Sequence, residues 1–460
     1  MAAYRFKSFR NGFSKTFSLL VGYFHKQFLQ HMNQTNPRRV VIIGGGFAGI
    51  NFAEQLLNNE NFSVTLVDKN NYNFFPPLLY QVATGYLESS NISYPFRKFF
   101  SGKKNFQFQM GALLKVVQDE NKVILTTGEL SYDILVFATG TETNYFGMEN
   151  VKRNAIPMKT IEDAIYMRNT LLERLEQASR SNDLEERKKL LTIVVAGGGP
   201  TGVEISGMFA DMKKLVVPKD YPELIGSHGE IYLVDGLNAV LTPMSEKSQK
   251  YTMDTLTKMG VQIKLNCMVK DFSNDIVEFS NGETIHAKTL IWAAGVTSSV
   301  FDGISKESYG RGRRMLVNEY NQVEGTRNIY AIGDTCLQTT DPGFTGGHPQ
   351  VAQVAIQQGK NLGKNLIHIL EGKTLIPFKY KDKGSMAIIG RNKAVADIPK
   401  PSIHFDGFIA WLAWMFVHLV SIIVFGNRIK TLYNWVVSYF SKDQSLRVIM
   451  RPSRESLDHS

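Results

Sequence analysis

Two glycine-rich turns are the segments of this chain whose residue types and spacing point most directly to chemistry. The first reads Gly44-Gly-Gly-Phe-Ala-Gly49, and the second reads Gly197-Gly-Gly-Pro-Thr-Gly202. In such turns the first glycine permits a sharp bend from strand to helix, the second lets the backbone approach a pyrophosphate, and the third lets helix and strand pack closely. The N-terminus of the helix offers free N–H groups to the phosphates. The two turns therefore predict two dinucleotide-binding sites.

An acidic residue follows each turn at the end of an apolar, strand-like segment. Asp68 lies 24 residues after Gly44. Asp235 lies 38 residues after Gly197, and an inserted stretch at 213–229 accounts for the longer distance. A carboxylate at this position accepts hydrogen bonds from ribose hydroxyls, and an acid in place of an arginine favours NAD over NADP.

Each glycine turn also has a closing Ala-x-Gly segment at nearly the same distance, which indicates that one unit occurs twice. Gly140 lies 96 residues after Gly44, and Gly295 lies 98 residues after Gly197. Strand, glycine turn, helix and acidic strand end recur in each unit. The predicted fold is therefore α/β, with two Rossmann-like dinucleotide-binding domains.

A third glycine and acid pair, Gly333-Asp334, ends the apolar stretch 328–332 after both units. A carboxylate at this strand end suits hydrogen bonds from the ribityl chain of a flavin, although a simple turn would have the same residues. Two dinucleotide folds in one chain are typical of FAD held permanently and NAD(P)H binding transiently. Converting hydride into single electrons also requires a flavin, because no side chain performs it.

Composition and charge narrow the class of protein. The net charge is +10, and residues 1–31 carry five basic residues and no acid. A basic excess suits an anionic membrane surface or phosphate ligands. The sequence has no RNA- or DNA-binding motif, so no nucleic acid partner is expected. Cys267 and Cys336 are the two cysteines, and their separation predicts small buried side chains rather than a disulfide. The histidine spacing predicts no metal site.

With these motifs, the chain resembles the type II NADH:quinone oxidoreductases, which are single-subunit, non-pumping respiratory dehydrogenases. The resemblance runs from about residue 38 to residue 442. The glycine turns alone fit the wider superfamily of flavoproteins with two dinucleotide-binding domains. Pro76–Gly85 and Tyr380–Ala387 also match the family. The Ala-Gln-x-Ala-x-Gln pattern within Val351–Gly359 and an aromatic-rich C-terminal tail are much more specific.

The resemblance implies FAD in the first unit and NADH in the second. Together with the motifs it gives the predicted cofactor-binding residues Gly44, Gly46, Phe47, Ala48, Gly49, Asp68, Lys69, Thr139, Gly140, Gly197, Gly199, Pro200, Thr201, Gly202, Asp235, Gly295, Gly333, Asp334, Ala352 and Gln353. It also implies the predicted catalytic residues Glu204, Gln353, Gln357 and Lys383.

Each of these catalytic residues has a plainer alternative. Glu204 resembles a family glutamate between the nicotinamide and quinone sites, but it could also cap the helix that follows the second turn. Gln353 and Gln357 share one helix face in an apolar setting. Their amides suit a quinone carbonyl, or they are merely buried and satisfied. Lys383 lies near the flavin by resemblance, or it is a solvated loop charge.

The two ends of the sequence have features that indicate where in the cell the protein is located. Residues 407–425 form a 19-residue run without Asp, Glu, Lys or Arg, and 428–441 form an amphipathic segment with an apolar stripe. Three arrangements are compatible: an in-plane membrane anchor, which the family uses, ordinary interface packing, and a short span. At the other end, residues 1–36 resemble a targeting or membrane-touching extension, or Met32 is the true start.

These observations give one predicted organisation and function. The predicted parts are 1–36, a basic extension; 37–154 and 297–375, the FAD-binding domain in two pieces; 155–296, the NADH-binding domain; and 376–460, a quinone-site and membrane-anchoring region. The predicted enzyme transfers hydride from NADH to FAD and two electrons to a membrane quinone. The alternatives are a soluble reductase feeding a ferredoxin-like protein and a non-catalytic flavin-binding interaction protein.

The predicted location is peripheral, with an anionic lipid surface as partner. The expected side is the cytoplasmic face of a bacterial inner membrane, or mitochondria if residues 1–36 are a transit peptide. A homodimer is expected.

Overall fold

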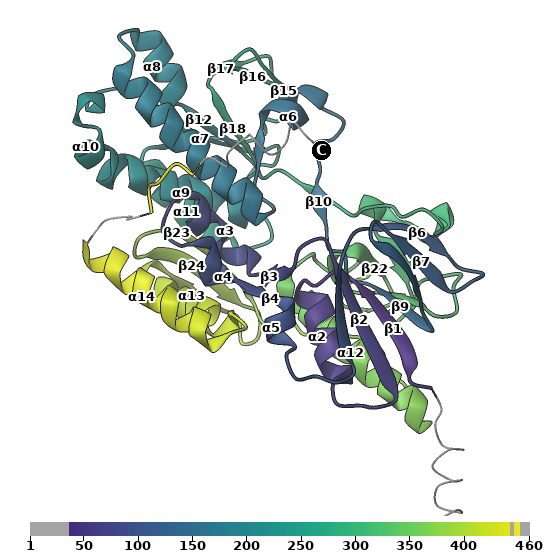
Figure 1. The fold of residues 1–460 in the computed structure, drawn as a ribbon. Coiled ribbons are helices and arrows are strands. Elements are labelled where there is room, and N and C mark those ends of the chain that lie inside the picture. Colours follow the sequence, from purple (N-terminus) through teal and green to yellow (C-terminus); the bar gives the residue numbers. More distant parts are fainter. Residues whose placement is uncertain (1–35, 442–445, 451–460) are drawn as a thin grey trace, which may run out of the picture.

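The first Rossmann-like unit is built on a five-stranded parallel sheet in the order β21-β9-β1-β2-β5 (Figure 1). The computed structural model describes residues 36–441 and 446–450 of the chain. The strands of this sheet are β1 (Arg38–Ile43), β2 (Phe62–Asp68), β5 (Phe106–Met110), β9 (Ile134–Phe137) and β21 (Ile329–Ala331). Because β21 follows the second unit in the chain, the polypeptide leaves this sheet and returns to complete it.

The second unit repeats this topology in a sheet of order β11-β18-β12-β13-β14. Its strands are β11 (Ile156–Pro157), β12 (Ile193–Ala196), β13 (Ile231–Val234), β14 (Val261–Lys264) and β18 (Thr289–Trp292). In both units the glycine turn follows the central strand, and the strand that ends in the acid lies beside it. The prediction of two Rossmann-like units is confirmed.

Each unit carries a small antiparallel sheet of three strands. They are β6 (Leu113–Val117), β7 (Lys122–Leu125) and β8 (Gly128–Ser131) in the first unit, and β15 (Val269–Ser273), β16 (Ile276–Phe279) and β17 (Thr284–His286) in the second. The two-residue loop between β15 and β16 consists of Asn274 and Asp275, with φ values of 50° and 61°. Asn and Asp tolerate this left-handed conformation, and such a loop matches the twist of the flanking strands.

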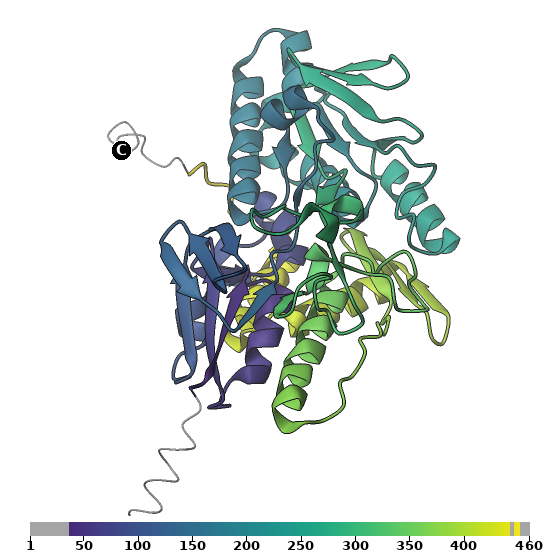
Figure 2. The ribbon, with the colours of Figure 1, turned by 90° about the vertical axis from the view of Figure 1, so that its right-hand side faces the viewer.

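Two helices cover one face of the first sheet, α2 (Phe47–Leu56) and α12 (Ala352–Glu371). They lie side by side in Figure 2, where α2 is purple and α12 is green. Glycines in α12 allow this close packing, because a Cβ on Gly359 would lie 2.5 Å from the Ala48 carbonyl oxygen. In the second unit α9 (Pro200–Leu215) follows the glycine turn, and α7 (Ile161–Arg180) begins with a capping box of Thr160 and Asp163.

Helix α7 is followed by α8 (Leu184–Leu191), and the two together form the charged connector that leads to β12. The remaining named helices and strands of the described residues are short or lie around these units: β3 (Tyr72–Phe74), α3 (Leu79–Ala83), α4 (Ser89–Ile92), β4 (Ser93–Pro95), α5 (Phe96–Phe99), β10 (Glu142–Thr143), α6 (Glu149–Asn154), α10 (Val217–Asp220), α11 (Glu246–Lys258), β19 (Val296–Thr297), β20 (Met315–Val317) and β22 (Cys336–Gln338).

The C-terminal part is a third, smaller layer. The antiparallel strands β23 (Ser385–Gly390), β24 (Lys393–Ile398) and β25 (Ile403–Asp406) precede α13 (Gly407–Ser421) and α14 (Phe425–Ser441). Figure 1 shows the two helices in yellow below this sheet. The sheet packs directly on the second unit, because a Cβ on Gly207 of α9 would lie 1.6 Å from the Ile389 carbonyl oxygen of β23.

The uncharged run 407–425 is not one continuous helix. Helix α13 ends at Ser421 with an extended Ile422, and α14 begins at Phe425. Within residues 36–441 and 446–450, no helical segment combines the length and the apolar character that spanning a bilayer requires.

Both helices expose apolar side chains. Those of α13 are Phe408, Ile409, Leu412, Phe416, Val417 and Val420, and those of α14 are Phe425, Ile429, Leu432, Tyr433, Val436, Val437 and Phe440. The residues that α14 buries are Asn427, Thr431 and Trp435. The apolar stripe predicted for 428–441 therefore faces outward, and the side toward the protein is the more polar one.

Candidate functional site

The two glycine turns have the same backbone geometry. Gly44 and Gly197 adopt φ values of 105° and 113°, in the left-handed region that favours glycine. A Cβ on Gly44 would lie 2.4 Å from the Ala138 carbonyl oxygen, and one on Gly197 would lie 2.5 Å from that of Ala293. The first glycine of each motif is thus required both by conformation and by the strand beside it.

The second glycine of each motif faces open space. A Cβ on Gly46 or Gly199 would meet nothing within 4 Å, and these two residues are the N-caps of α2 and α9. In contrast, a Cβ on Gly49 would lie 2.0 Å from the Gly44 carbonyl oxygen. The first unit therefore has a bare backbone cradle at a helix N-terminus, which fits the pyrophosphate of a dinucleotide. The second unit has the same cradle.

Each acid at a strand end binds its own glycine turn. The N–H of Gly45 donates to Asp68 Oδ2 at 2.6 Å, and the N–H of Gly198 donates to Asp235 Oδ2 at 2.5 Å. The other oxygen of Asp235 accepts the N–H of Leu237. Since a carboxylate has about four acceptor positions, each acid can order its turn and still accept a ribose hydroxyl.

One cavity of about 620 Å³ joins the two units. Of the residues predicted from the sequence, it is lined by Gly44, Gly46, Phe47, Ala48, Asp68, Thr139, Gly140, Pro200, Thr201, Glu204, Gly295, Gly333, Asp334 and Ala352. The predicted residues that do not line it are Gly49, Lys69, Gly197, Gly199, Gly202, Asp235, Gln353, Gln357 and Lys383. The first glycine turn and the start of α9 thus open onto the same space, which we call the central cavity.

Glu204 is a buried acid in the wall of the central cavity. It is the fifth residue of α9, and the first turn of that helix contains no acid, so it is not the helix cap. Burial raises the pKa of its carboxyl to about 8, although a hydrogen bond from the Ile388 backbone opposes the shift. The side chain is therefore protonated at neutral pH and able to donate a hydrogen bond.

Gln353 and Gln357 use their amides to hold the segment Tyr380–Gly384. Gln353 donates to the Gly384 carbonyl oxygen at 2.9 Å and accepts the N–H of Lys383 at 3.1 Å. Gln357 donates to the Lys381 carbonyl oxygen and accepts the Lys381 N–H. The side chain of Lys383 is exposed. These contacts match the plainer alternative of satisfied amides, and each amide nitrogen keeps a second hydrogen.

Lys159 is a residue of the central cavity that sequence reasoning missed. Its ammonium donates to Thr141 Oγ1 at 2.6 Å. Burial lowers the pKa of Lys159, and the nearby Asp334 carboxylate opposes the shift. A single lysine before a helix carries no motif, so only the fold shows that it meets Asp334.

His418 of α13 also lines the central cavity and was not predicted. Its Nδ1–H donates to the Trp414 carbonyl oxygen at 2.8 Å, since a carbonyl only accepts. Burial lowers its pKa to about 4, so the ring is neutral.

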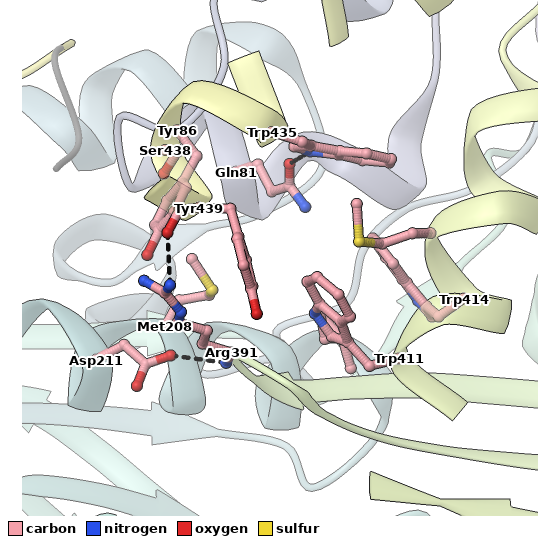
Figure 3. A pocket seen from close by; sticks show the side chains of 12 residues that line it. Gln81, Tyr86, Met208, Asp211, Arg391, Trp411, Trp414, Trp435, Ser438 and Tyr439 are labelled. Atoms are coloured by element: carbon pink, nitrogen blue, oxygen red, sulfur yellow. Dashed lines mark hydrogen bonds between the residues drawn. The ribbon is translucent and has the colours of Figure 1, made fainter. Parts of the chain in front are cut away.

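A second, smaller cavity of about 80 Å³ lies between α3, α9, β23, α13 and α14 (Figure 3). It is lined by Gln81, Tyr86, Met208, Asp211, Ile388, Arg391, Trp411, Trp414, Met415, Trp435, Ser438 and Tyr439. We call it the aromatic pocket. The Arg391 guanidinium lies 4.3 Å from the centre of the Tyr439 ring and closes one side.

The fold and the paired cradles define the class of flavoprotein oxidoreductases with two dinucleotide-binding units. A family model described as pyridine nucleotide-disulphide oxidoreductase matches residues 38–359, and one described as NDH2 C-terminal domain matches residues 383–442. Cys267 and Cys336 are both buried and free, as predicted, and lie in different units. The chain therefore has no cysteine pair for disulfide chemistry.

The relatives define the family more narrowly. The type II NADH:quinone oxidoreductase NdhA of Mycobacterium tuberculosis is 35% identical over 421 residues, which cover 88% of this chain and 87% of that protein. The external alternative NADH-ubiquinone oxidoreductase of Yarrowia lipolytica mitochondria is 30% identical, covering 89% and 81%. This chain belongs to the type II NADH:quinone oxidoreductase family.

A solved structure shares the fold. NDH2 from Plasmodium falciparum in complex with NADH superimposes with a TM-score of 0.82 and 22% sequence identity. The match covers 90% of this chain and 100% of that chain.

Proposed function

We propose that this protein oxidises NADH and reduces a membrane quinone in a respiratory chain, without pumping protons. The balance is NADH + H⁺ + quinone → NAD⁺ + quinol. Bound FAD supplies the chemistry that takes up hydride from NADH and delivers two electrons to the quinone. The observation that carries the proposal is the central cavity, because one continuous space reaches from the first glycine cradle to the start of α9.

Each cradle is proposed to hold one dinucleotide. In the first unit, Gly46 and the N-terminus of α2 face the pyrophosphate of FAD, and Asp68 accepts its ribose. Asp334 and Lys159 lie further along the central cavity, where they suit the ribityl chain and the flavin ring. In the second unit, Gly199 and Asp235 play the corresponding parts for NADH.

Glu204 is proposed to act where nicotinamide and quinone meet. Its buried, protonated carboxyl can donate a hydrogen bond to a carbonyl oxygen as negative charge develops there. Gln353 and Gln357 are proposed to position the segment Tyr380–Gly384 beside this region, and Lys383 belongs to that segment. The remaining predicted cofactor-binding residues, including Lys69, are proposed to bind FAD in the first unit and NADH in the second.

The outward apolar faces of α13 and α14 support attachment to a membrane surface. Phe416 is 66% exposed and Phe440 is 78% exposed, on neighbouring helices. An amphipathic helix with this pattern lies in the lipid interface, and a long-tailed quinone stays in that lipid. Lys430 is exposed on α14 and suits an anionic headgroup.

We further infer attachment on the cytoplasmic side, where a charged, soluble dinucleotide such as NADH is available. The proposal also includes a homodimer and the domain boundaries 37–154, 155–296, 297–375 and 376–460. The alternatives for 1–36 concern a segment that, except for residue 36, lies outside the described residues.

An anaerobic flavin spectrum of the purified protein tests the proposal. The protein should be yellow, its flavin should bleach when NADH is added, and a short-chain quinone should restore the colour while a ferredoxin does not. A preparation that stays colourless after FAD is supplied would overturn the proposal. A flavin that NADH does not bleach would do the same.

A further inference from the structure

The segment Pro76–Gly85 contains a short buried helix that the proposed function leaves without a role. All five residues of α3, Leu79–Ala83, are buried. Tyr80 and Gln81 are 2% and 5% exposed, and both carry polar groups. Buried polar groups are costly unless they are paired, so their partners indicate what this helix does.

Helix α3 stands between the two cavities. Tyr80 lines the central cavity, and Gln81 lines the aromatic pocket. Other elements divide in the same way. On α9, Glu204 lines the central cavity and Met208 lines the aromatic pocket, and on α13 the corresponding pair is His418 and Trp414. A single layer of side chains therefore separates the two spaces.

Two hydrogen bonds cross this layer in series. The indole N–H of Trp435 on α14 donates to Gln81 Oε1 at 2.7 Å, and Figure 3 shows this contact. The amide nitrogen of Gln81 donates in turn to the Tyr80 hydroxyl oxygen at 2.9 Å. The three residues come from two helices, with a sequence separation of 354 between Gln81 and Trp435.

The donor and acceptor roles in this series of hydrogen bonds are fixed by the Trp435 end. An indole N–H can only donate, so Gln81 must turn its carbonyl oxygen toward Trp435 and its NH₂ toward Tyr80. The Tyr80 oxygen is then an acceptor on that side, and its own hydrogen must point elsewhere. Within residues 36–441 and 446–450 that hydrogen has no acceptor, and the side chain lines the central cavity. Burial, with Glu204 adding to it, raises the pKa of the phenol well above its usual range, so the hydrogen stays in place.

We propose that the Tyr80 hydroxyl donates a hydrogen bond to a carbonyl oxygen of the quinone in the central cavity, and that Gln81 and Trp435 are positioning residues that aim it. This inference rests on the proposed function. A donor held in one direction by its neighbours needs no rearrangement as the carbonyl oxygen gains negative charge. The membrane-facing helix α14 thereby sets the orientation of a group that touches the substrate.

The test is a double-mutant cycle on the FAD-loaded, full-length protein. The variants are Tyr80→Phe, Trp435→Phe and the double variant. Trp411→Phe is the matched comparison, because Trp411 also lines the aromatic pocket but is not part of the hydrogen-bond chain. For each protein, flavin bleaching by NADH and flavin reoxidation by a short-chain quinone are timed separately without oxygen.

Tyr80→Phe should slow reoxidation by quinone roughly tenfold, as expected for one lost hydrogen bond, and leave bleaching by NADH unchanged. Trp435→Phe should slow reoxidation by about threefold, because Gln81 is then free to turn its amide. The double variant should be no slower than Tyr80→Phe alone, because Trp435 acts only through Tyr80. Any effect of Trp411→Phe should instead multiply with that of Tyr80→Phe.

Several results would overturn the inference. One is an unchanged reoxidation rate in Tyr80→Phe. A second is an equal slowing of bleaching and reoxidation, since the hydroxyl would then serve the flavin. A third is multiplication of the Trp435→Phe and Tyr80→Phe effects, which would leave Trp435 a packing role only. If Tyr80→Phe does not retain flavin, Gln81→Leu is tested against Trp435→Phe, and multiplication there also refutes the chain. A wild-type flavin that quinone fails to reoxidise would contradict the proposed function itself.

Discussion

Replacing Glu204 by glutamine should change how the stability of the protein depends on pH. The folded-state pKa of this carboxyl is about 8, against an ordinary value of 4.5. Between these two values the unfolded chain has lost the proton and the folded chain keeps it. The free energy of unfolding of the wild type therefore falls as pH rises through this window, and it changes no further above pH 8.

The size of the effect follows from the shift. A difference of about 3.5 pKa units at 1.36 kcal/mol each gives about 5 kcal/mol, as an upper estimate. Unfolding entropy of about 2.1 cal/mol/K per residue, over roughly 400 residues, converts this to about 6 °C in Tm. Glutamine fills nearly the same volume, accepts the Ile388 N–H and does not titrate, so Glu204→Gln should not show this loss.

Differential scanning calorimetry of both proteins with excess FAD measures the prediction. Between pH 5 and pH 8 the Tm of the wild type should fall relative to Glu204→Gln by roughly three quarters of this amount, about 4 °C. In parallel, quinone-dependent turnover of the wild type should decline above pH 8 as the donor ionises, and the variant should lack this decline. A Tm difference that stays constant from pH 5 to pH 8 would refute the assignment of Glu204 as a buried, protonated acid.

Three further predictions address the cradles, the loop and the membrane face. Asp235→Ala removes the acceptor of the Gly198 N–H and should raise the KM for NADH about tenfold while flavin stays bound. Asp68→Ala should instead lose flavin. Unchanged NADH kinetics of Asp235→Ala in steady-state assays would contradict the assignment of the second unit to NADH. Gln353→Leu removes the bonds to Lys383 and Gly384 and should slow quinone reduction about fivefold, more than flavin reduction, in stopped-flow traces; equal effects on both steps would count against it. The double variant Phe416→Glu, Phe440→Glu should bind anionic vesicles more weakly, by about a hundredfold or more, in a sedimentation assay. The control Leu184→Glu changes an equally exposed residue on α8 and should bind as the wild type does. Equal binding of the wild type, the double variant and the control would rule out the anchor.

The repeated unit was predictable because its constraints are local. Gly44 and Gly197 must have positive φ and lie against a neighbouring strand, so no other residue type fits and the spacing is visible in sequence. The exposed stripe of α14 was predictable for the same reason, since helical periodicity alone determines it.

What the sequence did not reveal depends on contacts between distant elements. Lys159 reaches the central cavity only because β11 lies beside β18, and the Tyr80 hydroxyl is oriented by Trp435, far along the chain. The break after Ser421 was also unforeseen, because no proline or charge marks it in the uncharged run. The amides of Gln353 and Gln357 were correctly placed on one helix, but their partners lie on a loop whose course follows from packing.

The exposed apolar faces of α13 and α14 have a consequence for handling the molecule. In water without lipid or detergent, association of two molecules through these apolar faces would be favourable, because it removes apolar surface from water. A particle mass obtained under such conditions would report this incidental pairing along with any true association. Mass determination in nanodiscs or mild detergent, compared with the Phe416→Glu, Phe440→Glu protein in plain buffer, separates the two kinds of contact.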